Sequence, residues 1–250
     1  MELTVLAYVF FVTFFSGFLQ TLTGFGYALS AAPLLTLVMS PKEVVMYILL
    51  TGLLIKGALV YQTRGQGQFR QILPIFLASI AGALPGAWVM TVISDGVLKI
   101  AIGLVLLAAT AAIYHNLTIP KDRPFLARTL VGLSSGFLAS TTSLNGPPIV
   151  LYYMGENADK HLIRANLARY FLLGNTASLV MSFYFGTLQV VSLFTYVVLS
   201  VPALGLGLWI GEIVFRKVDA NMFRRIALVV ISVSGTICIV MGLWSTFRFR

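Results

Sequence analysis

Charged side chains are scarce in this sequence, and that scarcity excludes a soluble fold. Only 10% of its 250 residues are charged, whereas soluble domains carry about 25%. Hydrophobic residues make up 58%, and several apolar stretches approach the roughly 20 residues that a helix needs to cross a bilayer. Backbone groups in lipid must be hydrogen-bonded within their own segment, which helices achieve. The sequence therefore predicts an all-α fold, a polytopic integral membrane helical bundle.

Cysteine, histidine and acidic residues within the apolar stretches are also rare. The single cysteine, Cys238, lies in an apolar run, which excludes a disulfide framework and a redox pair. His115 and His161 fall in predicted connections, and neither has the partners that a metal site needs. There is no Walker motif for ATP, and no pair of intramembrane acids for a proton pump or a protease. We therefore expect no enzyme activity, no metal and no cofactor.

The excess of positive charge fits a membrane protein better than a nucleic-acid-binding one. The net charge is +9, and the 17 Lys and Arg residues lie mostly in short connections, where the positive-inside rule predicts them. The chain begins Met1-Glu2-Leu3 without a basic region, so its first apolar segment is predicted to be a retained span rather than a cleaved signal. We expect a multi-pass protein of the bacterial cytoplasmic (inner) membrane that binds no nucleic acid.

Ten hydrophobic segments can be marked along the chain. They cover residues 3–22, 27–39, 44–62, 72–93, 97–114, 125–142, 148–154, 164–185, 190–215 and 223–247. The second and the seventh are too short to cross a membrane, since a helix rises only about 1.5 Å per residue.

Short sequences recur in the same order in the two halves of the chain. The tetrapeptide Ser-Gly-Phe-Leu at 16–19 returns at 135–138, and Gly-x-Trp at 86–88 returns at 207–209. These matches predict an internal duplication. The alternative is coincidence among residues that are common in membrane helices.

The two repeats are predicted to be residues 1–119 and 120–250, which together form one transport domain. If each short segment turns back as an element of its own, each half has five elements, and most basic residues fall on one side of the membrane. An odd number per half inverts the second repeat relative to the first, as in many secondary transporters. Counting each short segment with its predecessor gives eight spans and divides the basic residues evenly. We therefore predict two inverted repeats with both termini outside the cytoplasm.

Each half contains an interruption that is rich in glycine, proline and hydroxyl groups. Residues 20–27 read Gln-Thr-Leu-Thr-Gly-Phe-Gly-Tyr, and residues 140–148 read Ser-Thr-Thr-Ser-Leu-Asn-Gly-Pro-Pro. Each break is expected to end one helix and begin a short one, whose N-terminus attracts anions. Broken backbone within a membrane is tolerated only beside protein or a cavity, so the pair predicts a binding site between the repeats. Close helix packing by small residues is the alternative.

The predicted anion-binding residues are polar, glycine and proline positions of these breaks, with two cations from neighbouring segments. They are Gln20, Thr21, Thr23, Gly24, Gly26, Thr142, Asn145, Gly146, Pro147, Lys56 and Arg169. Lys56 either faces the anion or extends to the membrane interface, and Arg169 either turns toward the second break or reaches lipid headgroups.

Motifs at both breaks resemble the signatures of the TauE/SafE sulfite exporter family. The first-repeat signature is similar to Gly-Phe-Gly at 24–26 followed by Pro-Leu-Leu at 33–35. The second is similar to Ser-Ser-Gly at 134–136 with Asn-Gly-Pro-Pro at 145–148. The resemblance covers nearly the whole chain. It implies a membrane transporter that carries sulfite, sulfonates such as sulfoacetate, or other small organic anions.

The predicted function is a secondary transporter, an exporter of sulfite or a small organosulfonate or organic anion. Its expected partners are the anion and the lipid bilayer, and the sequence is compatible with a homodimer. A non-transporting membrane scaffold or assembly factor is the alternative, which would need an exposed polar docking surface. A thiol redox enzyme of the membrane is a third hypothesis, which a single cysteine disfavours.

Overall fold

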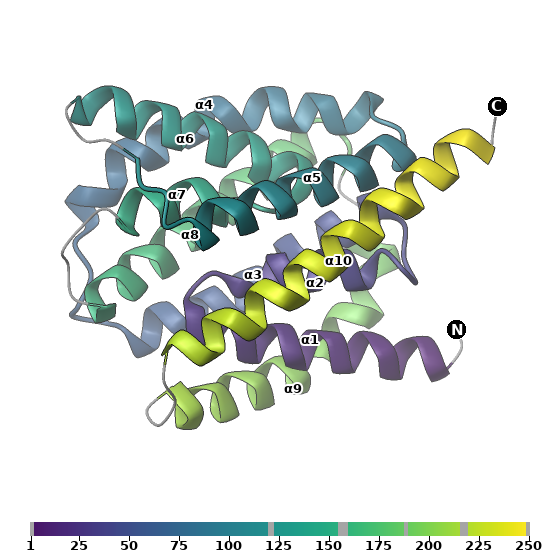
Figure 1. Cartoon of the computed structure of the whole chain (residues 1–250), viewed down its shortest axis with the longest axis horizontal. Helices are drawn as coiled ribbons and strands as arrows, with labels where there is room; N and C mark the ends of the chain where they lie inside the picture. The colour runs from purple at the N-terminus through teal and green to yellow at the C-terminus, as the bar shows by residue number, and fades with distance from the viewer. Residues whose placement is uncertain (1–2, 120–122, 155–159, 188–189, 216–219, 249–250) are drawn as a thin grey trace.

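The computed structural model describes residues 3–119, 123–154, 160–187, 190–215 and 220–248, which form ten helices (Figure 1). In chain order they are α1 (Leu3–Thr23), α2 (Gly26–Leu35), α3 (Pro41–Gln62), α4 (Phe69–Val92), α5 (Asp95–Tyr114), α6 (Pro124–Thr142), α7 (Gly146–Met154), α8 (Lys160–Tyr184), α9 (Val190–Phe215) and α10 (Ala220–Arg248). The predicted all-α fold is confirmed. The predicted segment ends differ most at Leu35, where α2 stops four residues before Met39, and at Lys160, where α8 starts four residues before Arg164.

Five of these helices are long and apolar enough to cross a membrane. They are α1, α3, α4, α5 and the Leu193–Phe215 part of α9. Large hydrophobic side chains such as Trp88, Phe183 and Trp209 are exposed on the outside of the bundle, where lipid tails would cover them. The protein is therefore a multi-pass integral membrane protein.

Several helices of each half pack against helices of the other half. The first helix of each half lies along the fourth helix of the other, because α1 packs against α9 and α6 against α4. The fifth helices, α5 and α10, pack together, and so do the third helices, α3 and α8. The start of α1 and the end of α10 lie at the same end of the bundle (Figure 1). Two related halves would produce this arrangement, and the boundary between residues 119 and 120 stays a prediction.

Glycines let α4 and α6 approach each other backbone to backbone. A Cβ added to Gly136 of α6 would lie 1.9 Å from the Ser79 carbonyl oxygen of α4. A Cβ on Gly82 of α4 would lie 2.0 Å from the Leu133 carbonyl oxygen. Close packing by small residues, the alternative considered for the breaks, is thus the role of these glycines outside the breaks.

The most deeply buried element is the short helix α2. Every one of its residues except Leu34 is buried, and α3 beside it is buried along much of its length. The largest fully buried side chains include Tyr27, Tyr47, Tyr153 and Phe171, which come from α2, α3, α7 and α8. The short helices and the third helices of the two halves therefore form the interior, where the predicted binding site would lie.

Candidate anion-binding site

The first break separates α1 from α2 at Gly24, whose φ of +83° lies in the left-handed region that favours glycine. Gln20 bridges this break: its Nε2 donates to the Gly24 carbonyl oxygen at 2.6 Å, and its Oε1 accepts from the Tyr27 backbone N–H at 3.0 Å. Thr23 Oγ1 accepts from the Gly26 N–H at 2.9 Å. These two side chains cap α2, so an anion at this break would have to displace one of them.

Thr21 lies on the side of α1 that faces α9. Its hydroxyl donates to the Gly17 carbonyl oxygen at 3.0 Å, one turn earlier in α1. A Cβ added to Gly211 of α9 would lie 2.7 Å from Thr21 Cβ. Thr21 therefore contributes to helix packing in this structure and does not join the capping network of the first break.

The second break leaves a buried amide without a partner. Ser143 adopts φ +56° at the end of α6, and Thr142 Oγ1 donates to the Leu138 carbonyl oxygen at 3.0 Å. The Asn145 carbonyl oxygen accepts from Ser135 Oγ at 2.7 Å. Asn145 is only 3% exposed, yet its Nδ2 has no hydrogen-bond partner among the residues that the structure describes. Such an unsatisfied donor costs about 1–3 kcal/mol, which a bound acceptor would recover.

The two breaks lie in contact with each other. A Cβ added to Gly146 would lie 3.5 Å from Phe25 Cβ and 3.7 Å from Phe25 Cδ2. Pro147, which follows in the first turn of α7, is buried. The breaks meet as the repeat interface requires, and the ring of Phe25 lies at their contact. Passage of an anion between the breaks would need this ring to move.

Lys56 places a basic side chain in the interior, linked to the second break through Asn175 and Gly174. Its side chain is 3% exposed, so the alternative in which it reaches the membrane interface is wrong. Its Nζ donates to Asn175 Oδ1 at 2.9 Å and lies 5.4 Å from the centroid of the Phe171 ring. The described residues give it no acidic partner. Asn175 directly follows Gly174, and a Cβ on that glycine would lie 3.5 Å from Asn145 Nδ2.

Arg169 is partly exposed, and its hydrogen bonds go to the end of α3 and to its own helix, not to the second break. Its two terminal nitrogens donate to the Thr63 carbonyl oxygen at 3.0 Å and to the Ala165 carbonyl oxygen at 2.9 Å. Thr63 is the C-cap of α3, where the helix dipole is negative. Arg169 therefore caps α3 and does not turn toward the second break, while its reach to lipid headgroups stays a prediction.

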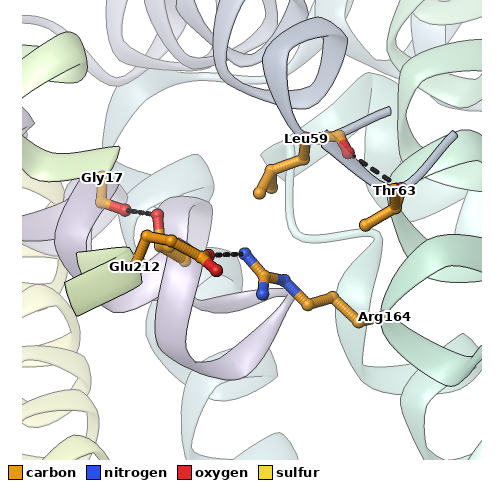
Figure 2. A network of polar contacts seen from close by, with 6 residues as sticks. Gly17, Leu59, Thr63, Arg164 and Glu212 are labelled. Carbon is orange, nitrogen blue, oxygen red and sulfur yellow. Dashed lines mark hydrogen bonds and ion pairs between the residues drawn. The ribbon is translucent and has the colours of Figure 1, made fainter. Parts of the chain in front are cut away.

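A partly buried ion pair near the first break was missed by the sequence analysis. Arg164 of α8 donates from one terminal nitrogen to Glu212 Oε2 of α9 at 3.0 Å, and its guanidinium carbon lies 4.7 Å from the centroid of the Phe215 ring. Figure 2 shows Arg164 reaching across toward Glu212, with Thr63 of α3 on another side of the same space. The two residues are 48 positions apart, and the sequence places each near a span end, which gives no signal that they pair.

One face of α8 joins all of these features. Arg164, Leu167, Phe171, Gly174 and Asn175 recur at the three- and four-residue spacing that places side chains on one side of a helix. Leu167 Cδ1 lies 3.7 Å from a Cβ built on Gly24 of the first break. Arg164 and Asn175 are separated by roughly 16 Å along the axis of α8, at a rise of about 1.5 Å per residue. The third helix of the second half thus connects the ion pair, both breaks and the buried cation.

The polar interior continues from the buried lysine toward the other end of α3. Tyr27 OH donates to Thr51 Oγ1 at 2.7 Å, and Tyr47 OH is within 2.5 Å of Thr13 Oγ1. Tyr47 also contacts the hydroxyl of Ser200 in α9. These buried hydroxyls close the interior on that side by hydrogen bonds among α1, α2, α3 and α9.

Comparison with known proteins gives one match. The family model described as "Sulfite exporter TauE/SafE" matches residues 9–237. That range contains both breaks, the buried lysine and the ion pair. No curated protein and no solved structure matches the chain.

Proposed function

The chain belongs to the TauE/SafE sulfite exporter family of membrane transporters, and from this premise we propose that it is a secondary transporter that exports sulfite or a small organosulfonate across the bacterial cytoplasmic membrane. The proposal concerns the chemical class of the anion, the direction of transport and the residues that bind.

The observation that carries the proposal is the buried basic side chain of Lys56, whose partner Asn175 directly follows Gly174, the glycine whose Cβ position lies 3.5 Å from the unpartnered Nδ2 of Asn145. Within the described part of the chain, Lys56 is held by a neutral amide and an aromatic ring, without an acidic partner. A charge buried without a counter-ion is unfavourable, and an anion is the partner that would offset this cost. At 4 Å and an effective dielectric constant of 20, the attraction amounts to about 4 kcal/mol.

The donors available suit an anion with several oxygen atoms. Lys56 carries three N–H donors and Asn145 Nδ2 carries two, whereas acidic side chains are absent from the described contacts of both residues. A sulfite or sulfonate group offers three oxygens that can accept these bonds together. Outward movement of such an anion is favoured by the membrane potential by about 2.3 kcal/mol per charge per 100 mV.

A transport assay with matched variants tests the proposal. In proteoliposomes with an inside-positive diffusion potential, the protein is expected to take up radiolabelled sulfite or sulfoacetate. Lys56→Met is expected to lower the rate by about tenfold or more, which corresponds to about 1.4 kcal/mol. Lys42→Met is the control, because it removes a lysine from the first turn of the same helix, α3.

Two outcomes would reject the proposal. One is that the intact protein moves neither anion. The other is that Lys56→Met and Asn145→Leu together transport at the rate of the unaltered protein. The second result would favour the alternative of a non-transporting scaffold or assembly factor, whose function would not depend on these buried groups.

A further inference from the structure

A polar cavity of about 280 Å³ opens where the ends of α3 and α9 meet the start of α8. Its wall includes Gln62, Gln66, His161, Arg164, Glu212 and Phe215. This cavity is separate from Lys56 and Asn145, because the α8 residues beside them, Asn175 and Gly174, lie about three helical turns after Arg164. Its volume is close to the lower end of the range for small-molecule sites, which begins at about 300 Å³.

The guanidinium group of Arg164 is held on two sides and has donors left over. One terminal nitrogen bonds Glu212 Oε2 at 3.0 Å, and the ring of Phe215 covers one face. Arg164 is only 9% exposed, and its Nε has no hydrogen-bond partner among the described residues. A guanidinium has five N–H donors arranged to bind a planar pair of oxygens, and the unpartnered Nε is a donor that a second acceptor would satisfy.

The surroundings of Arg164 favour an anion as that acceptor. The cavity lies at the first turn of α8, where the helix dipole is positive, and Arg169 already caps the negative end of α3 at Thr63. The guanidinium already binds the carboxylate of Glu212, and a sulfonate presents a similar pair of oxygens. The side chain of Arg164 also borders the first break, since a Cβ on Gly24 would lie 3.9 Å from Arg164 Cγ.

We propose that this cavity is a second anion-binding site, at which Arg164 receives the sulfonate or sulfite before it moves along α8 to the inner site. Glu212 competes with the anion for Arg164 and neutralises the guanidinium when the cavity is empty. This inference rests on the proposed function, since the anion that enters here is the transported one.

Protection of a cysteine in the cavity wall tests the site without relying on transport. The single native thiol is removed by Cys238→Ser, and Gln66→Cys places a new thiol in the exposed part of the wall. The purified protein is labelled with N-ethylmaleimide in the presence of sulfoacetate, which, unlike sulfite, does not add to maleimides. Dimethyl sulfone, a neutral compound of similar size, is the control ligand.

Sulfoacetate is expected to slow the labelling of Gln66→Cys several-fold, and dimethyl sulfone is expected to have no effect. Adding Arg164→Gln should abolish the protection. Adding Glu212→Gln should lower the half-protecting concentration by roughly five- to tenfold, because the competing charge-assisted hydrogen bond is lost. If Arg164→Gln does not fold, Arg164→Lys serves instead: it keeps the charge, loses the Nε donor, and should bind several-fold more weakly.

The outcomes separate this site from the proposed function. Absence of protection in Gln66→Cys, or equal protection with and without Arg164, would overturn the second site while leaving the transport assay intact. Protection that persists in Lys56→Met, a variant expected to transport poorly, supports two distinct sites. Protection that disappears in Lys56→Met would show that the cavity does not bind by itself and would overturn the inference.

Discussion

At the scale of single residues, the amides of Asn145 and Gln20 differ in a way that the sequence does not reveal. Both lie in a polar break and both are predicted to contact the anion. In the structure both the nitrogen and the oxygen of the Gln20 amide bind the backbone of the first break, whereas Asn145 Nδ2 has no described partner. Sequence identifies a polar break but not whether its side chains turn toward the backbone or toward a ligand.

This difference predicts opposite effects of two apolar substitutions. Asn145→Leu keeps the shape and removes an unsatisfied donor, so the free energy of unfolding should change by less than about 1 kcal/mol while anion transport is lost. Gln20→Leu leaves the Gly24 carbonyl and the Tyr27 N–H without their side-chain partner and should lower the free energy of unfolding by about 2–3 kcal/mol. Thermal unfolding in detergent, followed with the transport assay, measures both. A strongly destabilised Asn145→Leu would show that this amide is structural.

The two cations illustrate the same limit of sequence reasoning. Lys56 lies in the middle of an apolar segment, a position that already favours function, and the structure buries it. Arg169 lies at a similar depth in its own segment, but it binds the end of α3. The distinction depends on Thr63, which is 106 residues away in the chain, so no local pattern could supply it.

At the scale of elements, the start of α3 has a readable sequence signal, whereas the end of α2 has none. Ser40 and Glu43 form a capping box around Pro41, a pattern that is readable in the sequence and that starts α3 three residues before the predicted Val44. The end of α2 at Leu35 has no such signal, because the apolar residues continue to Met39. Leu37 and Val38 are apolar yet exposed, so hydrophobicity there marks neither the helix nor burial.

Helix packing predicts which glycines are indispensable. Gly136→Ala should destabilise the protein by more than about 3 kcal/mol or abolish folding, because the new Cβ would collide with the Ser79 carbonyl oxygen on α4. Gly205→Ala in α9 is the matched control: nothing lies within 4 Å of its Cβ position. Alanine there should be neutral or stabilise by up to about 1 kcal/mol.

Size-exclusion profiles and thermal unfolding of the two glycine variants in detergent check this prediction. Equal stability of Gly136→Ala and Gly205→Ala would mean that α4 and α6 separate easily, which is inconsistent with their packing through glycine. The sequence marks Gly136 as a repeated position, but only the structure shows that its neighbour is α4 of the other half.

At the scale of the whole molecule, the ten helical segments could be predicted from the sequence, the duplication stays a prediction, and the pairing of helices between the halves could not be predicted. Repeated motifs indicate that the halves are related but do not say which helices meet. In the structure α1 lies along α9 and α6 along α4, which brings the two breaks together at Phe25 and Gly146. The site is therefore a product of the pairing, since neither half alone would bring the breaks together.

Orientation in the membrane decides whether the Arg164 cavity is an entrance or an exit. The cavity lies at the end of α3 and the start of α8, and Arg64, Arg70 and Arg123 occupy connections or helix starts that the topology assigns to the same side. The positive-inside rule places that side in the cytoplasm. An exporter would then receive its anion at this cavity.

Thiol labelling in intact cells tests this orientation. In a Cys238→Ser background, a membrane-impermeant maleimide should label Asp95→Cys, at the exposed start of α5, and should leave Gln66→Cys unlabelled until the membrane is permeabilised. The reverse pattern would place the cavity outside the cell. The anion would then leave from the Arg164 site during export, or enter there during uptake, and the competition between Glu212 and the anion would control release instead of capture.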